Sequence, residues 1–413
     1  MNKVPKLRFK EFIDEWEEKK LENIVDLIDG DRGKNYPNEN DIKKEGILFL
    51  STSNFSNNKL IFNKNDKFIS VEKFNQLTKG QLNKNDLIIT LRGSIGNVII
   101  FENKFYDTAF INAQMMILRP KNTDKYFLHN FFQNSKIQSI LQNISSGSAQ
   151  PQLTKKDLKN FILTFPSIKE QQKIAKFLSI VDKKISIAEE KLDLFKDYKK
   201  GIMQKIFNQK LRFKDSNGND YSEWEEKRLG DLITSQGGKA LEKYSNDNGK
   251  YKFISIGNYS ENSTFIDNGK RIDLNSETKK QLLRKNELVM ILNDKTKTGN
   301  IIGRTLLIEK DDTYIYNQRS QRIICKKDFL PQFAYVLLNS SYRNNIIQNA
   351  QGGTQIYINF STIENFSIEL PCLEEQQKIA NFLSSIDNKI DNLATELEDL
   401  KEFKKGLLQQ MFV

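Results

Sequence analysis

The chain carries a long internal repeat, and this repeat constrains its architecture more than any other sequence feature. PSIKEQQKIAKFLSIVDKKI at 166–185 returns as PCLEEQQKIANFLSSIDNKI at 371–390, an offset of 205 residues. Further downstream, KKGIMQKIF at 199–207 returns as KKGLLQQMF at 404–412. A repeat of this length indicates that the fold is built from two related halves.

A second pair of matching segments marks the beginning of each half. EWEEKKL at 15–21 matches EWEEKRL at 223–229, and the tetrapeptide LRFK precedes both. The chain's two tryptophans, Trp16 and Trp224, occupy corresponding positions. The halves therefore agree in these framework segments and differ in the long stretches between them, as expected for one scaffold that carries two different functional surfaces.

Each repeated tail has the heptad spacing of a long amphipathic helix. In the first copy the apolar series is Ile174, Leu178, Val181, Ile185, Ala188, Leu192 and Phe195, then Ile202 and Ile206. In the second copy it is Ile379, Leu383, Ile386, Ile390, Leu393, Leu397 and Leu400, then Leu407 and Met411. Lys199 and Lys404 interrupt the two series at the same place. A helix of about 40 residues is about 60 Å long.

Two packing arrangements are open to such helices. Ser167 and Glu170 have capping-box spacing just after Pro166, which predicts that the first helix begins there. Because a single helix cannot bury its own apolar seam, we expect the two helices to pair as an antiparallel coiled coil. The alternative is that each helix docks separately on its own globular lobe.

The stretches between the framework segments have the character of globular α/β lobes. Strand-like runs such as ILFLS and DLIITL in the first lobe, and YKFISIG and ELVMIL in the second, are separated by polar segments. The predicted fold class is α+β, with two α/β lobes joined by two long helices and related by an internal pseudo-twofold repeat. The predicted boundaries are a framework segment at 1–21, the first lobe at 22–165, the central helix at 166–210, the second framework segment at 211–229, the second lobe at 230–370 and the C-terminal helix at 371–413.

The composition suits an intracellular protein with a polyanionic partner. Among 413 residues, 64 Lys plus Arg oppose 53 Asp plus Glu, giving a formal net charge of +11; this favours nucleic acid, although a lysine-rich proteome gives a similar balance. Cys325 and Cys372 are too few for a disulfide framework, and no Cys or His spacing suggests a metal site. With no apolar leader and no run near the ~18 apolar residues of a membrane span, we expect a cytoplasmic protein.

Motifs for DNA-modifying chemistry are absent from the sequence. There is no G-x-x-x-x-G-K-[ST] phosphate loop, no glycine-rich nucleotide fingerprint after a strand and no Asn-Pro-Pro-aromatic tetrapeptide. The single histidine, His129, lies in YFLHNFF, where helix packing is favoured over the role of a general base. Asp66, Asp86 and Asp294 lie in polar segments, where most carboxylates are solvated turn residues, and no acid–base pair stands out. The sequence thus predicts a non-catalytic chain.

Two variable lobes that alternate with two near-identical helices carrying EQQKIAxFLS resemble the specificity subunits of type I restriction-modification enzymes. The resemblance covers the whole chain. It implies that each lobe is a target recognition domain for one half of a split double-stranded DNA site. It implies that the paired helices separate the lobes and receive two methyltransferase (modification) subunits, and that restriction subunits join through the complex. S-adenosylmethionine, ATP and catalysis would then belong to the partner chains.

Polar residues in the lobe loops are the candidates for DNA contact. Arg suits guanine and Asn or Gln suits adenine, although most protein–DNA hydrogen bonds go to phosphate and sugar. One glycine-containing segment aligns between the lobes, matching Gly147 and Gln150 with Gly352 and Gln355; the alternative is a plain polar turn. The other candidates are Asn54, Arg92, Ser94, Asn97, Asn112 and Gln114 in the first lobe, and Asn258, Tyr259, Lys295, Lys297, Arg319, Gln321 and Arg322 in the second.

The candidates for partner binding lie on the repeated helices. We expect matching residues to point outward as two equivalent docking sites, namely Gln171, Gln172 and Lys173, and Gln376, Gln377 and Lys378. Two alternatives remain for the function. A standalone DNA-modifying enzyme would cleave or modify DNA without partners, whereas a coiled-coil scaffold for proteins would lack salt-dependent DNA binding.

Overall fold

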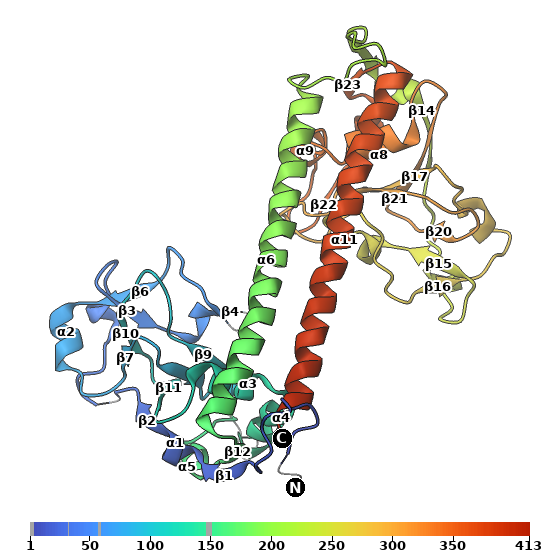
Figure 1. Ribbon diagram of the computed structural model, residues 1–413. Helices are drawn as coiled ribbons and strands as arrows, with labels where there is room; N and C mark the ends of the chain where they lie inside the picture. Colours follow the sequence, from blue (N-terminus) through green and yellow to red (C-terminus); the bar gives the residue numbers. More distant parts are fainter. Residues whose placement is uncertain (1–3, 32, 57–58, 146–150) are drawn as a thin grey trace. The chain divides into compact units, whose positions relative to one another are not determined.

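The computed structural model of the chain (Figure 1) describes residues 4–31, 33–56, 59–145 and 151–413. The chain divides into two compact units, of which the first comprises Met1–Glu190 with Thr395–Val413 and the second Lys191–Ala394. Both ends of the chain therefore belong to the first unit, where the backbone N–H of Leu7 donates to the carbonyl of Gln410 at 2.9 Å.

The first lobe is a mixture of short strands and short helices. Its strands are β1 (Glu17–Lys20), β2 (Val25–Asp29), β3 (Ile47–Leu50), β4 (Phe55–Ser56), β5 (Lys59–Leu60), β6 (Lys67–Ile69), β7 (Gln81–Asn83), β8 (Leu87–Thr90), β9 (Val98–Ile100), β10 (Thr108–Ile111), β11 (Met115–Pro120) and β12 (Ile162–Phe165). Its helices are α1 (Leu21–Ile24), α2 (Val71–Gln76), α3 (Lys125–Gln133), α4 (Ser135–Ser145) and α5 (Lys155–Asn160).

Two four-stranded sheets organise this lobe. The antiparallel sheet has the order β2-β11-β8-β9, and the second sheet has the order β6-β3-β10-β7, with β10 parallel to β3. All four residues of β8 are buried because the strand has neighbours on both edges and packed layers on both faces. In register, Ile117 of β11 lies opposite Ile88 of β8, and both are fully buried. The second sheet therefore contains both parallel and antiparallel strand pairs.

The second lobe repeats this plan with different sequences. Its strands are β13 (Glu225–Arg228), β14 (Ile233–Gly237), β15 (Tyr251–Ile254), β16 (Arg271–Ile272), β17 (Leu288–Ile291), β18 (Asn293–Asp294), β19 (Thr305–Leu307), β20 (Tyr314–Tyr316), β21 (Ser320–Cys325), β22 (Ile356–Tyr357) and β23 (Ser367–Leu370). Its helices are α7 (Leu229–Leu232), α8 (Pro331–Leu338), α9 (Arg343–Gln348) and α10 (Phe360–Glu364). The sheet β14-β21-β17-β19 corresponds to β2-β11-β8-β9, and β15 pairs in parallel with β20 as β3 does with β10.

The two long helices are α6 (Ile168–Phe207, 40 residues) and α11 (Leu373–Met411, 39 residues). The predicted beginning of α6 is correct, because the helix begins at Ile168, directly after Ser167. The backbone N–H of Glu170, in the first turn, donates to Ser167 Oγ at 3.4 Å. In the second unit, Ile379 and Leu383 of α11 are buried in the same core as Phe333 of α8, so the helix also contributes to the lobe's interior. The mixed helix and strand content and the internal repeat of the predicted fold are confirmed.

The lysines that interrupt the two apolar series have a structural explanation. In the first unit, Lys404 Nζ lies 2.7 Å from Asp182 Oδ1 of α6. In the second unit, Lys199 Nζ lies 2.5 Å from Asp387 Oδ1 of α11. Each lysine thus pairs with a carboxylate on the other long helix, and the two aspartates are themselves related by the repeat.

Candidate nucleic-acid interface

Three segments of the first lobe meet at one edge, which we call the first loop edge. They are the loop after β8, the turn before β11 and the segment before α5. The backbone N–H of Leu91 donates to the carbonyl of Gln114 at 2.8 Å, and the N–H of Leu153 donates to the carbonyl of Leu91 at 3.0 Å. These main-chain bonds join the three segments without using their side chains.

The second lobe has the same edge, which we call the second loop edge. The backbone N–H of Leu292 donates to the carbonyl of Arg319 at 2.8 Å, and the N–H of Ile358 donates to the carbonyl of Leu292 at 3.0 Å. Strand β18 extends this edge by pairing Asn293 with Tyr357 of β22. The geometry is therefore duplicated although the loop sequences are unrelated.

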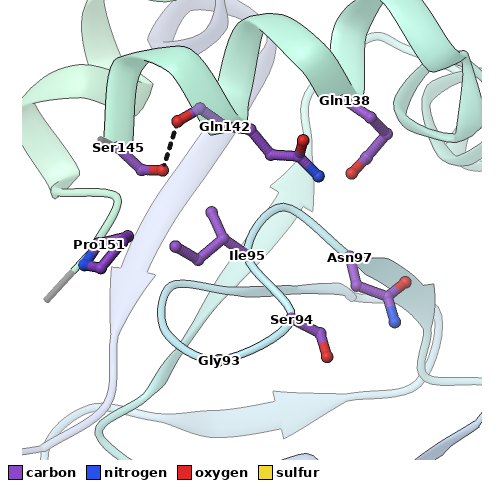
Figure 2. Close-up of a pocket in the computed structure, with 8 residues that line it drawn as sticks. All are labelled: Gly93, Ser94, Ile95, Asn97, Gln138, Gln142, Ser145 and Pro151. Carbon is purple, nitrogen blue, oxygen red and sulfur yellow. Dashed lines mark hydrogen bonds between the residues drawn. The ribbon is translucent and has the colours of Figure 1, made fainter.

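Several predicted contact residues come together at the first loop edge. Arg92 is exposed, and its Nε and Nη2 donate to Gln152 Oε1 at 2.8 and 2.6 Å. Ser94 and Gln114 are exposed, and Asn112, half-buried, accepts from the N–H of Gln114 at 3.0 Å. A cavity of about 460 Å³ lies between the loop and α4, lined by Gly93, Ser94, Ile95, Asn97, Gln138, Gln142, Ser145 and Pro151 (Figure 2). Gly147 and Gln150 lie outside the described residues.

The second loop edge is more basic. Lys295 and Lys297 are exposed in the loop after β17, and Arg319 is exposed in the turn before β21 with a left-handed φ of 67°. Gly352 and Gln355 are exposed just before β22. Gly352 has a φ of 117°, and a Cβ there would collide with the carbonyl oxygen of Gln355, so this position requires glycine.

Three predicted contact residues are instead structural. Asn54 is buried; its Nδ2 donates to Asp66 Oδ1 at 2.8 Å, and its Oδ1 accepts from the N–H of Ser51 at 3.0 Å. Its counterpart Asn258 is also buried and closes the equivalent turn. Tyr259 is buried and donates to Ser320 Oγ at 3.0 Å, and burial raises the pKa of its hydroxyl. The expectation that these three residues face DNA is therefore wrong, because their polar atoms satisfy hydrogen bonds within the lobe itself.

The ion pairs beside the antiparallel sheets also contradict predictions made from the sequence. Arg322 pairs with the buried Glu287, much as Arg119 pairs with the buried Asp86 at 2.7 Å in the first lobe. Arg322 therefore supports the sheet, whereas its neighbour Gln321 on β21 stays half-exposed. Asp86 and Asp294, expected to be solvated turn residues, are only 3% and 4% exposed.

The expected outward residues of the long helices divide into three kinds. Gln171 and Gln376 are buried, which contradicts the expectation, and the remaining four contact the framework or lie at the surface. Gln171 Oε1 accepts from Thr123 Oγ1 at 2.8 Å and from the backbone N–H of Asp124 at 3.0 Å, at the start of α3. Gln376 Oε1 accepts from the N–H of Leu330 at 2.9 Å, at the start of α8. Each glutamine thus ties its long helix to a lobe helix.

The next two residues of each long helix lie nearer the surface. Lys173 pairs with Glu11 and lies 4.8 Å from the ring centroid of Phe9, and Lys378 donates to the carbonyl of Lys214 at 2.5 Å. Gln172 and Gln377 are exposed. Both lysines contact the framework segments, but Lys173 is exposed and Lys378 is half-buried. Gln172, Lys173 and Gln377 therefore remain exposed as predicted.

A buried clamp at the start of each long helix was not predicted. Arg8 Nε and Nη2 lie 2.7 and 2.8 Å from the carboxylate of Glu170, and Trp16 Nε1 donates to the same carboxylate at 3.3 Å. In the second unit, Arg212 Nη2 and Trp224 Nε1 lie 2.9 and 3.0 Å from Glu375 Oε2.

The clamps explain the matching framework segments. The hydrogen bonds to these carboxylates raise the pKa of both arginines. The duplicated LRFK and EWEEK motifs were the signal that could have revealed the clamps, since Arg and Trp repeat together with the distant Glu. These residues fix lobe, framework and helix to one another within each unit.

The surroundings of His129, the single histidine, agree with a packing role. This residue is partly buried in α3, and burial together with the nearby Lys404 lowers its pKa to about 4. Its Nε2 lies 3.0 Å from Gln133 Nε2.

Over the described ranges, no three His, Cys, Asp or Glu side chains form a group able to hold a metal ion. Over the same ranges, no helix is long and apolar enough to cross a membrane.

Comparisons with known proteins agree with this arrangement. Residues 13–195 and 221–402 match the family model of the type I restriction modification DNA specificity domain. The MjaVIII specificity subunit of Methanocaldococcus jannaschii, a type I restriction enzyme subunit, is 30% identical over 350 residues, which cover 81% of this chain and 80% of that relative. The HindI specificity subunit of Haemophilus influenzae is 28% identical over 202 residues, 46% of this chain and 41% of that relative.

Solved structures share the fold. The S subunit of a type I restriction-modification system from M. genitalium superposes with a TM-score of 0.59 at 17% identity and covers 99% of both chains. A chain from a structure that concerns complex assembly and conformational transition of the type I R-M system gives a TM-score of 0.57 at 15% identity, covering 96% of this chain and 97% of that one.

Proposed function

Because the chain belongs to the family of type I restriction-modification DNA specificity subunits, we propose that each of its two lobes reads one half of a split DNA site. The observation that carries this proposal is the duplicated loop edge, where main-chain bonds hold three loops in the same way in both lobes. A fixed backbone that carries exposed side chains is what direct readout of base edges needs.

The side chains at the two edges support two unlike half-sites. Arg92, Ser94, Asn97, Asn112 and Gln114 give the first edge amide, hydroxyl and one guanidinium group. The second edge instead offers exposed cationic and amide groups, from Lys295, Lys297, Arg319 and Gln355, together with the half-exposed amide of Gln321. Because Arg and Lys favour guanine or phosphate and Asn or Gln favour adenine, the two lobes should prefer different base sequences.

The long helices are proposed to act as a spacer between the readers. The Lys404–Asp182 and Lys199–Asp387 pairs, each within its own unit, support pairing of α6 with α11 as an antiparallel coiled coil. A spacer of fixed length would set an unread gap between half-sites about one helical turn apart. The lobes at 22–165 and 230–370 would then be exchangeable parts on a common frame.

The remaining functions are assigned to partner chains. Relatives are named as subunits of type I restriction enzymes, and one similar chain comes from a structure that concerns complex assembly in such a system. We assign methylation with S-adenosylmethionine, and ATP-dependent restriction, to those partners, and we assign no catalysis to this chain. Two modification subunits would dock on the outward faces of α6 and α11.

The two docking faces differ in polarity. On α6, Ile180 and Ile187 are 52% and 50% exposed and lie one heptad apart. The repeat places Ser385 and Asn392 at the same positions of α11, and both are exposed. The face on α6 should therefore bind its modification subunit with the larger apolar contribution.

Exchange of one lobe tests the proposal most directly. The first lobe, residues 22–165, would be replaced by the corresponding lobe of a relative, and the full complex would be expressed in cells whose methylated adenines are mapped by sequencing. One half of the methylated site should change, while the other half and the gap stay the same. Exchange of residues 230–370 alone is the reciprocal control and should change only the other half. A map in which both halves change together would contradict independent reading.

A further inference from the structure

The loop that carries Lys295 and Lys297 is held by a buried arginine. Arg343 is the first residue of α9 and is 8% exposed. Its Nε donates to the carbonyl of Ile302 at 2.8 Å, and its Nη2 donates to the carbonyl of Gly299. One side chain therefore satisfies two carbonyls of the loop after β17.

The first lobe has a glutamine in the same place. Gln138 lies on α4, and its Nε2 donates to the carbonyl of Gly96 at 2.8 Å, in the loop after β8. Figure 2 shows Gln138 on the helix that faces this loop. Gln138 and Arg343 are 205 residues apart, the offset that relates the two long helices. Neither residue stood out in the sequence, because one is an amide and the other a guanidinium.

A second contact confirms that the two loops sit on their helices in the same way. Gly96 has a φ of 77°, and a Cβ there would lie 3.0 Å from Leu141 Cδ1 of α4. Gly303 has a φ of 75°, and a Cβ there would lie 2.9 Å from Ile346 Cδ1 of α9. Leu141 and Ile346 are again 205 residues apart. The left-handed φ of each glycine, together with this close approach of loop to helix, favours glycine in both lobes.

The two anchors differ in strength. The loop of the second lobe is longer, and the buried Asp294 folds it from within by accepting from the N–H groups of Thr296 and Ile301 at 2.9 and 2.8 Å. Burial and Arg304 lower the pKa of Arg343 to about 10, while Asp294 and Glu261 act in the opposite direction, so Arg343 is charged at neutral pH. A charged donor makes stronger hydrogen bonds than the neutral amide of Gln138.

We infer that Gln138 and Arg343 are positioning residues for DNA recognition, each of which fixes the recognition loop of its own lobe on the following helix. The inference rests on the proposed reading of DNA by the loop edges. It adds that the bases preferred by each lobe depend on a residue that does not itself lie at the loop edge. Because Arg343 holds two carbonyls and Gln138 holds one loop carbonyl, the second lobe should depend more strongly on its anchor.

The test compares Arg343→Gln with Gln138→Leu in the full chain, assembled with its modification subunits. Ser139→Ala and Asn344→Ala are matched controls, because these exposed residues follow the two anchors directly in sequence. Binding is measured on DNA libraries randomised in one half-site at a time, and the melting temperature of each variant is recorded. Lobe exchange assigns each half-site to its lobe beforehand.

The expected result is selective. Arg343→Gln should lower discrimination between cognate and mismatched bases about tenfold in the half-site of the second lobe and leave the other half-site unchanged. Gln138→Leu should lower discrimination about threefold in the half-site of the first lobe only. Both controls should match the wild type.

Two outcomes would overturn the inference. One is a lower melting temperature with unchanged discrimination, which would make the anchors merely structural; the other is an equal loss in both half-sites. If Arg343→Gln fails to fold, Gln138→Leu, which changes no charge, tests the positioning role by the same criteria. A wild-type complex that discriminates in neither half-site would refute the proposed function itself, separately from the role of the anchors.

Discussion

The two lobes share their framework down to single hydrogen bonds, yet they present different chemistry at their loop edges. Glu170 and Glu375 each bind an Arg and a Trp, and Gln171 and Gln376 each bind the start of a lobe helix. By contrast, the loop after β8 in the first lobe carries Ser94, whereas the corresponding loop of the second lobe is basic and carries Lys295. The comparison teaches that the exposed side chains of these loops can vary while the main-chain bonds that join the loops stay the same.

The clamps offer the largest expected effect with which to test this comparison. Glu375→Ala leaves Arg212, whose side chain is 18% exposed, with only the exposed Glu223 at 3.6 Å. Glu170→Ala leaves Arg8, whose side chain is 12% exposed, without the carboxylate of Glu170. Removing one partner of a buried pair costs about 3 kcal/mol or more in the free energy of unfolding. Urea unfolding, followed separately for each unit with site-specific fluorophores, should give similar losses in the unit that carries each change.

A matched control separates the clamp from simple packing. Replacing both partners together, as in Arg212→Met with Glu375→Leu, removes the buried charge and should restore most of the lost free energy of unfolding. If Glu170→Ala and Glu375→Ala differed by more than about 2 kcal/mol, the two clamps would not be equivalent.

Because of His129, the first lobe should lose more stability than the second lobe as the pH falls. His129 has a pKa of about 4 in the fold against 6.5 when unperturbed, so the unfolded chain binds its proton more tightly. The contribution of neutral His129 to the free energy of unfolding is complete above pH 6.5 and is lost as the pH falls toward 4. The loss between pH 7 and pH 5 is about 2 kcal/mol. In the second lobe Tyr335 lies one turn after the start of α8, where burial raises its pKa to about 12, and it does not titrate in this range.

The measurement for this prediction is the free energy of unfolding from pH 7 to pH 5 in the wild type and in His129→Gln. The variant should lose less stability over that interval, and the difference should be confined to probes in the first unit. Parallel curves for the two proteins would show that His129 does not carry the acid sensitivity.

The smallest expected effect concerns salt. Lys295→Gln with Lys297→Gln should reduce the slope of log affinity against log salt concentration by about 0.9 for each DNA phosphate that the lysines had neutralised. Ser94→Ala in the first lobe carries no charge change and should leave the slope as it is. Both slopes are obtained from affinities for one cognate duplex at several salt concentrations. An unchanged slope in the double lysine variant would show that these lysines do not contact DNA phosphates.

The sequence predicted those features that depend on order along the chain. The repeat, the heptad series and the cap at Ser167 are local patterns, and the long helices α6 and α11 lie where these patterns placed them. The strand-like runs DLIIT and ELVMI likewise became the buried central strands β8 and β17. The resemblance to the specificity subunits was carried by the same patterns.

The tertiary structure alone decided which polar residues face solvent. Asn54, Asn258 and Gln171 read as surface residues in the sequence, since an amide that bonds to buried backbone has the same side chain as one that bonds to DNA or water. Gln171 finds its partner Thr123 48 residues away, and Arg343 finds the carbonyl of Ile302 41 residues away. Periodicity describes neighbours along one helix or strand, whereas the burial and pairing of a polar group depend on segments that only folding brings together.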